Sequence, residues 1–302
     1  MVGGGGAQGS YNGARNPGAG GGQVQDVDTL RFVPGTYTVV VGTGGAENEP
    51  GNYSEITGVL RSIGGGASYV AVANGGDGAN GGGVTQSTAT PGRSLVGGYR
   101  GGYGNNSSTS GNAGGGAGAG GDGQNGNAGG GGGAPLSSNI SDTPTDYGAG
   151  CSRGLNGAGT ANTGNAGHPG ASGIVILRWN PTTLANAGLT LSFTGGSTTT
   201  GLSGGDSIRI WTASGSFVVG TRTDYELSGT AVLAGMGVSG ATVRVIRMST
   251  GETIDTLTTD GSGNFSCLGV SENESYHVTV EYENGGQRYN APAIWDVVPV
   301  SA

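Results

Sequence analysis

The sequence predicts a mostly β and irregular protein: a glycine-rich, polyglycine-II-like domain on a small β framework, followed by an Ig-like β-sandwich. Most of the 72 glycines in the 302 residues lie before residue 181. Strand-like segments flank these glycine runs, and short strand-like runs recur at about ten-residue spacing after residue 225. The change in composition predicts a glycine-rich domain at 1–180, a β connector at 181–224 and a sandwich at 225–302.

The stretch 111–133 carries no large side chain, so it has neither the helical nor the strand apolar period. One interpretation is a flexible linker. The other is a bundle of polyproline-II-like glycine helices, with about 3 residues per turn and no internal hydrogen bonds. Only many packed runs could offset the conformational entropy that ordered glycine loses, and this chain has many. Collagen is excluded because no strict Gly-X-Y period is kept.

Strand signals are concentrated around the glycine runs. Residues 30–32 and 36–41 predict two strands, 53–63 is expected to pair with 68–72, and 172–179 predicts a buried apolar strand. The segments Val2-Gly-Gly-Gly-Gly, Pro34-Gly-Thr-Tyr-Thr-Val-Val-Val-Gly and Gly173-Ile-Val-Ile-Leu-Arg-Trp together resemble the glycine-rich domain of bacteriophage tail fibres and tail-tip adhesins, over residues 1–179. The resemblance implies stacked polyglycine helices on a β framework, with variable tips exposed to the host surface.

One feature departs from that family. Its members carry an aromatic strand before the first glycine run, whereas here a similar segment comes later, at 206–219. We therefore hypothesise that residues 189–219 complete the glycine-rich domain, in the same chain or in a neighbouring one. The alternative is a separate small β unit or linker.

The last region predicts an all-β fold with strands at 226–233, 241–248, 253–258, 264–268, 276–282 and 293–298. Val243 and Val245 should face the core while Arg244 faces outward. The strings Leu227-Ser-Gly-Thr-Ala-Val and Thr258-Thr-Asp-Gly-Ser-Gly-Asn-Phe resemble the carboxypeptidase-regulatory-like (transthyretin-like) family. That resemblance implies a non-catalytic accessory fold.

Charge and composition exclude several function classes. The net charge is −8 and all 12 basic residues are arginine, which argues against nucleic acid as a partner. No run approaches the length of an apolar membrane span, and no Sec signal is visible. Cys151 and Cys267 lie in different predicted domains, so free thiols are expected, with a bridge as the alternative.

The residues that catalysis needs are sparse, and we expect no enzyme, no metal and no cofactor. His168 and His277 are far apart in the sequence and match no metal-ligand spacing. The segment 260–264 resembles half of a calcium loop but lacks its distal glutamate, so a hairpin turn is favoured.

Two polar and aromatic groups stand out in the glycine field as candidate receptor-binding residues. The first is Tyr99, Arg100 and Tyr103, and the second is Asp142, Asp146, Tyr147 and Arg153. Aromatic faces and planar polar groups are common in recognition surfaces. The alternative is that the tyrosines cap glycine helices as small local cores.

These observations predict a structural and adhesive virion component, a tail fibre or tail tip exposed at the particle surface. Expected partners are further copies of the chain, other tail or capsid proteins, and a host-surface glycan or protein. Low apolar content favours oligomer assembly, and the family resemblance implies a trimer. A capsid or tail decoration protein and a non-viral bacterial surface or matrix protein are the alternatives.

Overall fold

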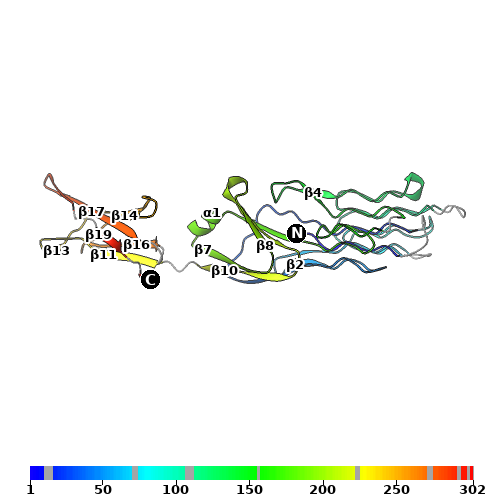
Figure 1. Cartoon of the computed structure of the whole chain (residues 1–302), viewed down its shortest axis with the longest axis horizontal. Coiled ribbons are helices and arrows are strands. Elements are labelled where there is room, and N and C mark those ends of the chain that lie inside the picture. The colour runs from blue at the N-terminus through cyan, green and yellow to red at the C-terminus, as the bar shows by residue number, and fades with distance from the viewer. Residues whose placement is uncertain are drawn as a thin grey trace. The chain divides into compact units, whose positions relative to one another are not determined.

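A computed structural model describes residues 1–9, 16–69, 74–105, 112–154, 157–221, 225–270, 275–290, 294–297 and 300–301. The chain is mostly β, with many antiparallel strands in several small sheets and almost no helix (Figure 1). It forms two compact units, Met1–Leu184 with Thr190–Gly220 and Ala185–Leu189 with Thr221–Ala302.

Two small sheets form the β framework of the first unit. The larger has the order β3-β2-β1-β10-β7, with β1 (Gly35–Val40), β2 (Ser54–Ile56), β3 (Leu60–Ser62), β7 (Leu189–Thr194) and β10 (Gly215–Thr221). The smaller has the order β6-β9-β8, with β6 (Val175–Trp179), β8 (Ser197–Thr200) and β9 (Ser207–Trp211). Other elements are a hairpin of β4 (Leu136–Ser138) and β5 (Thr145–Tyr147), a short helix α1 (Pro181–Asn186), and the 3-10 turns η1 (Gly126–Ala128) and η2 (Ser203–Gly205).

Residues 189–219 supply strands to both of these sheets. Strand β10 pairs antiparallel with β1, which sets Tyr37 opposite Phe217. Strand β9 pairs antiparallel with β6, which sets Ile176 opposite Ile210. The segment thus pairs, within its own chain, with the two strands that flank the glycine runs.

One expectation for this region was wrong. Residues 30–32 form no strand; instead the Phe32 ring packs edge-on against Tyr37 and Phe217. Residues 53–63 pair with themselves, because β2 and β3 form a hairpin. Part of the partner expected for them, residues 70–72, lies outside the described residues.

Aromatic side chains join the two sheets. The rings of Tyr37 and Phe217 stack at a centroid distance of 5.0 Å, and Phe217 lies 6.0 Å from Trp211. Phe193 continues the series, 5.8 Å from Trp211 and 5.1 Å from Trp179. Trp211 and Phe217 are fully buried. This cluster concentrates in one place the large apolar area that the glycine runs lack.

The glycine runs form no regular helix or sheet, yet their backbone hydrogen bonds repeat every three residues. In the run 114–119, successive amides donate to three different neighbours in turn. Gly114 donates to Val84 and Ala117 to Gly81, on the first neighbour. Gly115 donates to Gln124 and Gly118 to Gly121, on the second, while Gly116 donates to Cys151 and Ala119 to Gly148, on the third. The run at the N-terminus shows the same repeat toward two of its neighbours. Gly3 donates to Gln23 and Gly6 to Gly20, and likewise Gly4 donates to Asn52 and Ala7 to Glu49.

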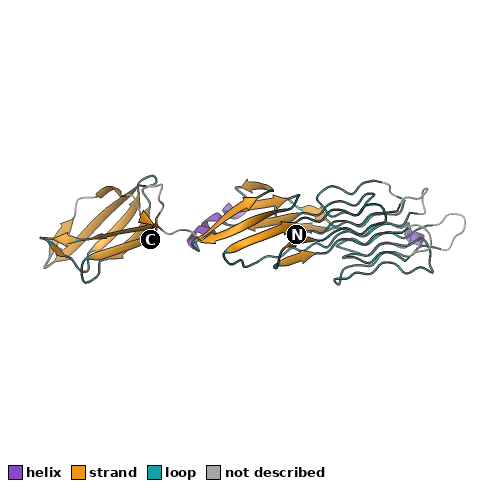
Figure 2. Cartoon of the chain, turned by 90° about the horizontal axis from the view of Figure 1, so that it is seen from below, coloured by secondary structure: helices purple, strands orange, loops and turns teal. Residues whose placement is uncertain are grey.

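The repeat of three in 114–119 means that this run makes three residues per turn and has neighbours on three sides. Neighbours run in both directions. The acceptors of Gly18 and Gly21 rise along the chain, from Gly114 to Ala117, whereas those of Gly20 and Gln23 fall, from Gly66 to Ile63. The wavy loop segments of Figure 2 that lie side by side are these runs. We call this hydrogen-bonded bundle the glycine lattice.

Close approach of the backbones explains why the lattice needs glycine. A Cβ atom added to Gly116 would lie 1.8 Å from the carbonyl oxygen of Ala19, and one added to Gly115 would lie 1.9 Å from that of Gly131. Both obstacles are backbone atoms, which cannot rotate away. Larger side chains are therefore restricted to the positions that face outward or fill gaps between runs.

The second unit has two sheets around one core. The three-stranded sheet has the order β16-β11-β20, with β11 (Tyr225–Thr230), β16 (Asn264–Val270) and β20 (Val300–Ser301). The other has the order β15-β14-β17-β18, with β14 (Thr242–Arg247), β15 (Thr253–Thr258), β17 (Tyr276–Asn284) and β18 (Gln287–Asn290), and with β19 (Ile294–Val297) also paired to β17. A small hairpin joins β12 (Val232–Leu233) to β13 (Met236–Gly237).

Side chains from both sheets fill that core, among them Leu227, Val243, Val245, Cys267, Tyr276 and Val278. Val243 and Val245 are fully buried and Arg244 is partly exposed, as the alternation predicted. Cys151 and Cys267 are buried in different units and are not bridged to each other. Burial raises the pKa of the Cys151 thiol to about 12.

The close approach at Gly116 predicts a large effect of a single methyl group. Gly116→Ala should destabilise the first unit by at least about 2 kcal/mol, because the new Cβ meets backbone that cannot move aside. Gly121→Ala is the matched control, since a Cβ there would be 3.6 Å from its nearest neighbour, an ordinary contact. Urea unfolding followed by tryptophan fluorescence measures both. Equal stability of the two variants would contradict the close-packed lattice.

Candidate binding surface

Residues 93–105, here called the outer run, are held by side-chain carbonyl groups. Four side-chain Oδ1 atoms accept backbone amides of this run. Asp77 accepts from Arg93 at 2.7 Å and Asn80 from Tyr99 at 3.2 Å. Asp122 accepts from Arg100 at 2.7 Å and Asn125 from Tyr103 at 2.8 Å. Asp77 and Asn80 are three residues apart, as are Asp122 and Asn125, and this spacing is the repeat of the lattice. We call these four acceptors the Asx ladder. At these positions the side-chain oxygen of an aspartate or asparagine accepts an amide that a backbone carbonyl accepts elsewhere in the lattice.

Sequence reasoning missed the Asx ladder, although a signal was present. Asn74, Asp77 and Asn80 recur at three-residue spacing between glycines, as do Asp122 and Asn125. In a helix or a strand this spacing has no such meaning, so it becomes informative only once a three-residue repeat is assumed.

The first predicted group, Tyr99, Arg100 and Tyr103, lies together on the outer run. Tyr99 and Tyr103 are 40% and 37% exposed, and Arg100 is exposed as well. The guanidinium carbon of Arg100 lies 5.9 Å from the centre of the Tyr103 ring. Since Arg100 and Tyr103 are one repeat apart, they project from the same side of the run. Leu95 and Val96, also exposed, come just before them.

The members of the second predicted group have separate roles. Tyr147 is 5% exposed and packs with Val2 and Ile174, and this burial raises the pKa of its phenol. It therefore forms a local core, as the alternative interpretation expected. Asp146 is exposed on β5, opposite Ser137. Arg153 donates its backbone amide to Gly130 and its guanidinium to Asn112.

Asp142 belongs to a polar clasp with Arg178, Ser203 and Asp206. Arg178 donates to Asp142 at 2.7 Å and to Asp206 at 2.8 Å. Both carboxylate oxygens of Asp142 also accept hydrogen bonds from Ser203, one from its amide and one from its hydroxyl. These bonds and the nearby guanidinium lower the pKa of Asp142 to about 2. The clasp ties the β4–β5 turn to β6 and η2.

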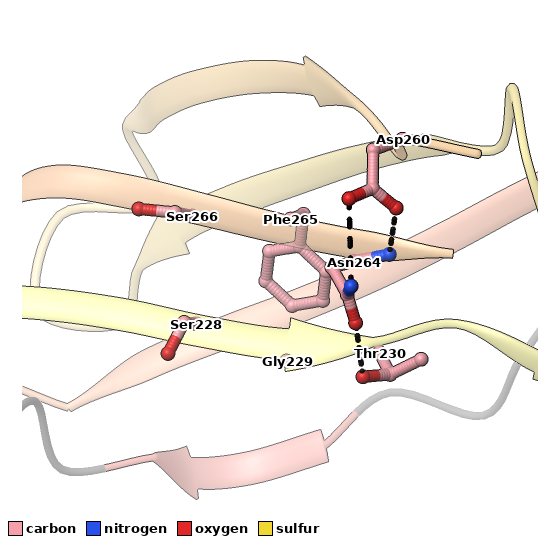
Figure 3. A pocket seen from close by; sticks show the side chains of 7 residues that line it. All are labelled: Ser228, Gly229, Thr230, Asp260, Asn264, Phe265 and Ser266. Atoms are coloured by element: carbon pink, nitrogen blue, oxygen red, sulfur yellow. Dashed lines mark hydrogen bonds between the residues drawn. The ribbon is translucent and has the colours of Figure 1, made fainter. Parts of the chain in front are cut away.

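A hollow of about 440 Å³ lies on the second unit, beside the β11–β16 ladder (Figure 3). The Phe265 ring packs over Gly229, its partner across the ladder. Beside it, the Asp260 carboxylate accepts the backbone amides of Ser262 and Asn264, both at 2.8 Å. These bonds lower the pKa of Asp260 and form the turn between β15 and β16.

The residues that the structure describes include no group of three or more His, Cys, Asp or Glu side chains placed to hold a metal ion. None of the described helices is both long enough and apolar enough to cross a membrane.

Comparison with protein-family models, with curated proteins and with solved structures found no match for this chain.

The clasp predicts a pH-dependent contribution to stability. The pKa of Asp142 is below its usual value of 3.8, so its contribution is complete above about pH 4 and is lost as the pH falls toward about 2. Asp142→Asn should therefore melt at a lower temperature than the wild type at pH 7, and the gap should close at pH 2. Asp146→Asn, on the same hairpin, is the control and should match the wild type throughout. A gap that does not change with pH would contradict this role.

The Asx ladder predicts that the acceptor oxygen matters and the charge does not. Asp122→Asn keeps the carbonyl that accepts the Arg100 amide and should leave stability unchanged. Asp122→Ala removes that acceptor and should cost about 1 kcal/mol. Amide hydrogen exchange at Arg100 reports the loss directly, and equal exchange in the two variants would argue against the ladder.

Proposed function

We propose that this chain is a structural and adhesive component of a bacteriophage virion, in a tail fibre or tail tip, and that it is not an enzyme. In this proposal the first unit is a polyglycine-II-like domain and the second is a transthyretin-like sandwich that attaches or spaces it. The protein would be exposed on the virion surface.

The observation that carries the proposal is the three-residue hydrogen-bond repeat of the glycine lattice. This repeat supports a scaffold whose stiffness comes from hydrogen bonds between backbone groups. The side chains that face outward then contribute little to the stability of that scaffold. The sequence resemblance to phage glycine-rich domains points in the same direction. A rigid scaffold that presents a few polar and aromatic side chains suits recognition, because little entropy is lost when a partner binds.

The outer run supplies the recognition surface in this proposal, with Tyr99, Arg100 and Tyr103 as its contact residues and a host-surface glycan or protein as its partner. Further partners are copies of this chain, proposed to form a trimer, and other tail or capsid proteins. Asp142 and Tyr147 are reassigned from contact residues to structural ones, since the clasp and the local core engage them.

Electron microscopy of particles from a phage that encodes this chain tests the proposal. Gold-labelled antibodies against the chain should mark the tail fibres or tail tip. Label on the capsid would favour a decoration protein instead. Label on the bacterial envelope, with unlabelled particles, would overturn the virion assignment in favour of a surface or matrix protein.

A further inference from the structure

We propose that the outer run binds an acidic saccharide. The binding strip is centred on Arg100 and Tyr103, which share one side of the run, and it includes the exposed residues Leu95, Val96 and Tyr99 that precede them in the chain. A sugar ring would stack on the exposed face of Tyr103, and the acidic group of the saccharide would pair with the Arg100 guanidinium. This inference rests on the proposed adhesive function and names the chemical class of its ligand.

The charge argument comes from comparing three arginines that lie over aromatic rings. Arg61 lies 4.2 Å from the Tyr53 ring, but Glu55 neutralises it at 3.2 Å. Arg209 lies 5.0 Å from the Phe193 ring and donates to Gly195 and Thr198.

Arg100 differs from both, because among the described residues its guanidinium has no hydrogen-bond acceptor or acidic partner. Its backbone amide alone is engaged, by Asp122. A guanidinium that no described acceptor or acidic side chain contacts presents a planar fork of donors that suits a carboxylate, sulfate or phosphate group. The chain has a net charge of −8, so attraction of an acidic ligand to this site would come from Arg100 itself and not from the overall charge of the protein.

The aromatic argument comes from exposure and rigidity. Tyr99 and Tyr103 are exposed on a run whose glycines, Gly101 and Gly102, are buried in the lattice. The amides of Tyr99 and Tyr103 are fixed by Asn80 and Asn125. An aromatic face is electron-rich, and the C–H groups of a sugar ring carry the opposite polarity, so an exposed ring on a fixed backbone is a stacking platform.

The size of the strip favours a saccharide over a protein. A typical protein interface uses about 20 residues on each side. The strip offers five side chains, and Gly97, Gly98, Gly101 and Gly102 between them add no side-chain contact. A short sugar segment needs no more than one or two stacking faces and a charged group.

Isothermal titration calorimetry on the full chain tests the inference with two acidic probes, oligogalacturonate and dextran sulfate, and two neutral ones, maltooligosaccharide and dextran. At least one acidic probe should bind, and its neutral counterpart should bind at least about tenfold more weakly. Arg100→Gln and Tyr103→Ala should each weaken binding of that probe by about tenfold or more. Arg61→Gln, at the matched arginine–tyrosine pair, should bind like the wild type.

Thermal melting of each variant guards against misfolding, and Arg100→Lys provides a second variant that keeps the charge and should retain part of the affinity. If neither acidic probe binds, or if folded Arg100→Gln binds as tightly as the wild type, the inference is wrong.

Binding to bacterial cells separates this inference from the proposed function. If the wild type and Arg100→Gln bind cells equally, the adhesive function is supported and the inference that the strip binds an acidic saccharide is wrong. If the wild type binds no cells from the phage's host, the adhesive function falls, whatever the saccharide result. Cell binding that is lost after protease treatment of the cells, but survives periodate oxidation, would identify a protein ligand and overturn the inference.

Discussion

The backbone hydrogen bond between neighbouring glycine runs is the interaction on which the first unit depends. A strand bonds to neighbours on two sides, in one plane. The runs of this lattice bond on three sides, because each amide in turn points to a different neighbour, as in 114–119. Such a bundle is held in three dimensions by backbone groups alone, and it therefore needs few apolar side chains in its interior.

Glycine both permits this arrangement and limits it. Carbonyl oxygens lie where Cβ atoms would be, as at Gly116, so the interior has no room for side-chain chemistry. Large apolar residues gather instead where strands replace glycine runs, in the aromatic cluster around Trp211 and Phe217. Outward positions remain free to vary, and the Asx ladder shows how polar side chains take over the role of backbone carbonyls at the boundary. This separation of scaffold and surface supports the proposed adhesive function.

The sequence predicted the strands better than their partners. The β-branched run at 36–41 corresponds closely to β1, the apolar run at 172–179 contains β6, and the segment 253–258 coincides with β15. Partners were harder to predict, because glycines carry no side chains that mark which run lies beside which. The burial of Tyr147 could not be predicted for a related reason: the residues that pack against it, Val2 and Ile174, are distant in the sequence. The group at Tyr99, Arg100 and Tyr103 could be singled out because large side chains are conspicuous among glycines, and its role in recognition stays a prediction.

Native-state amide hydrogen exchange of the run 114–119 tests the central claim most directly. Each of these amides has a backbone acceptor in a neighbouring run. The account predicts that they exchange as slowly as the paired amides of β1 and β10, because lattice and sheet open together. Exchange of 114–119 at the rate of an unstructured peptide, while β1 and β10 stay protected, would show that the glycine runs are loose tethers and would contradict the account.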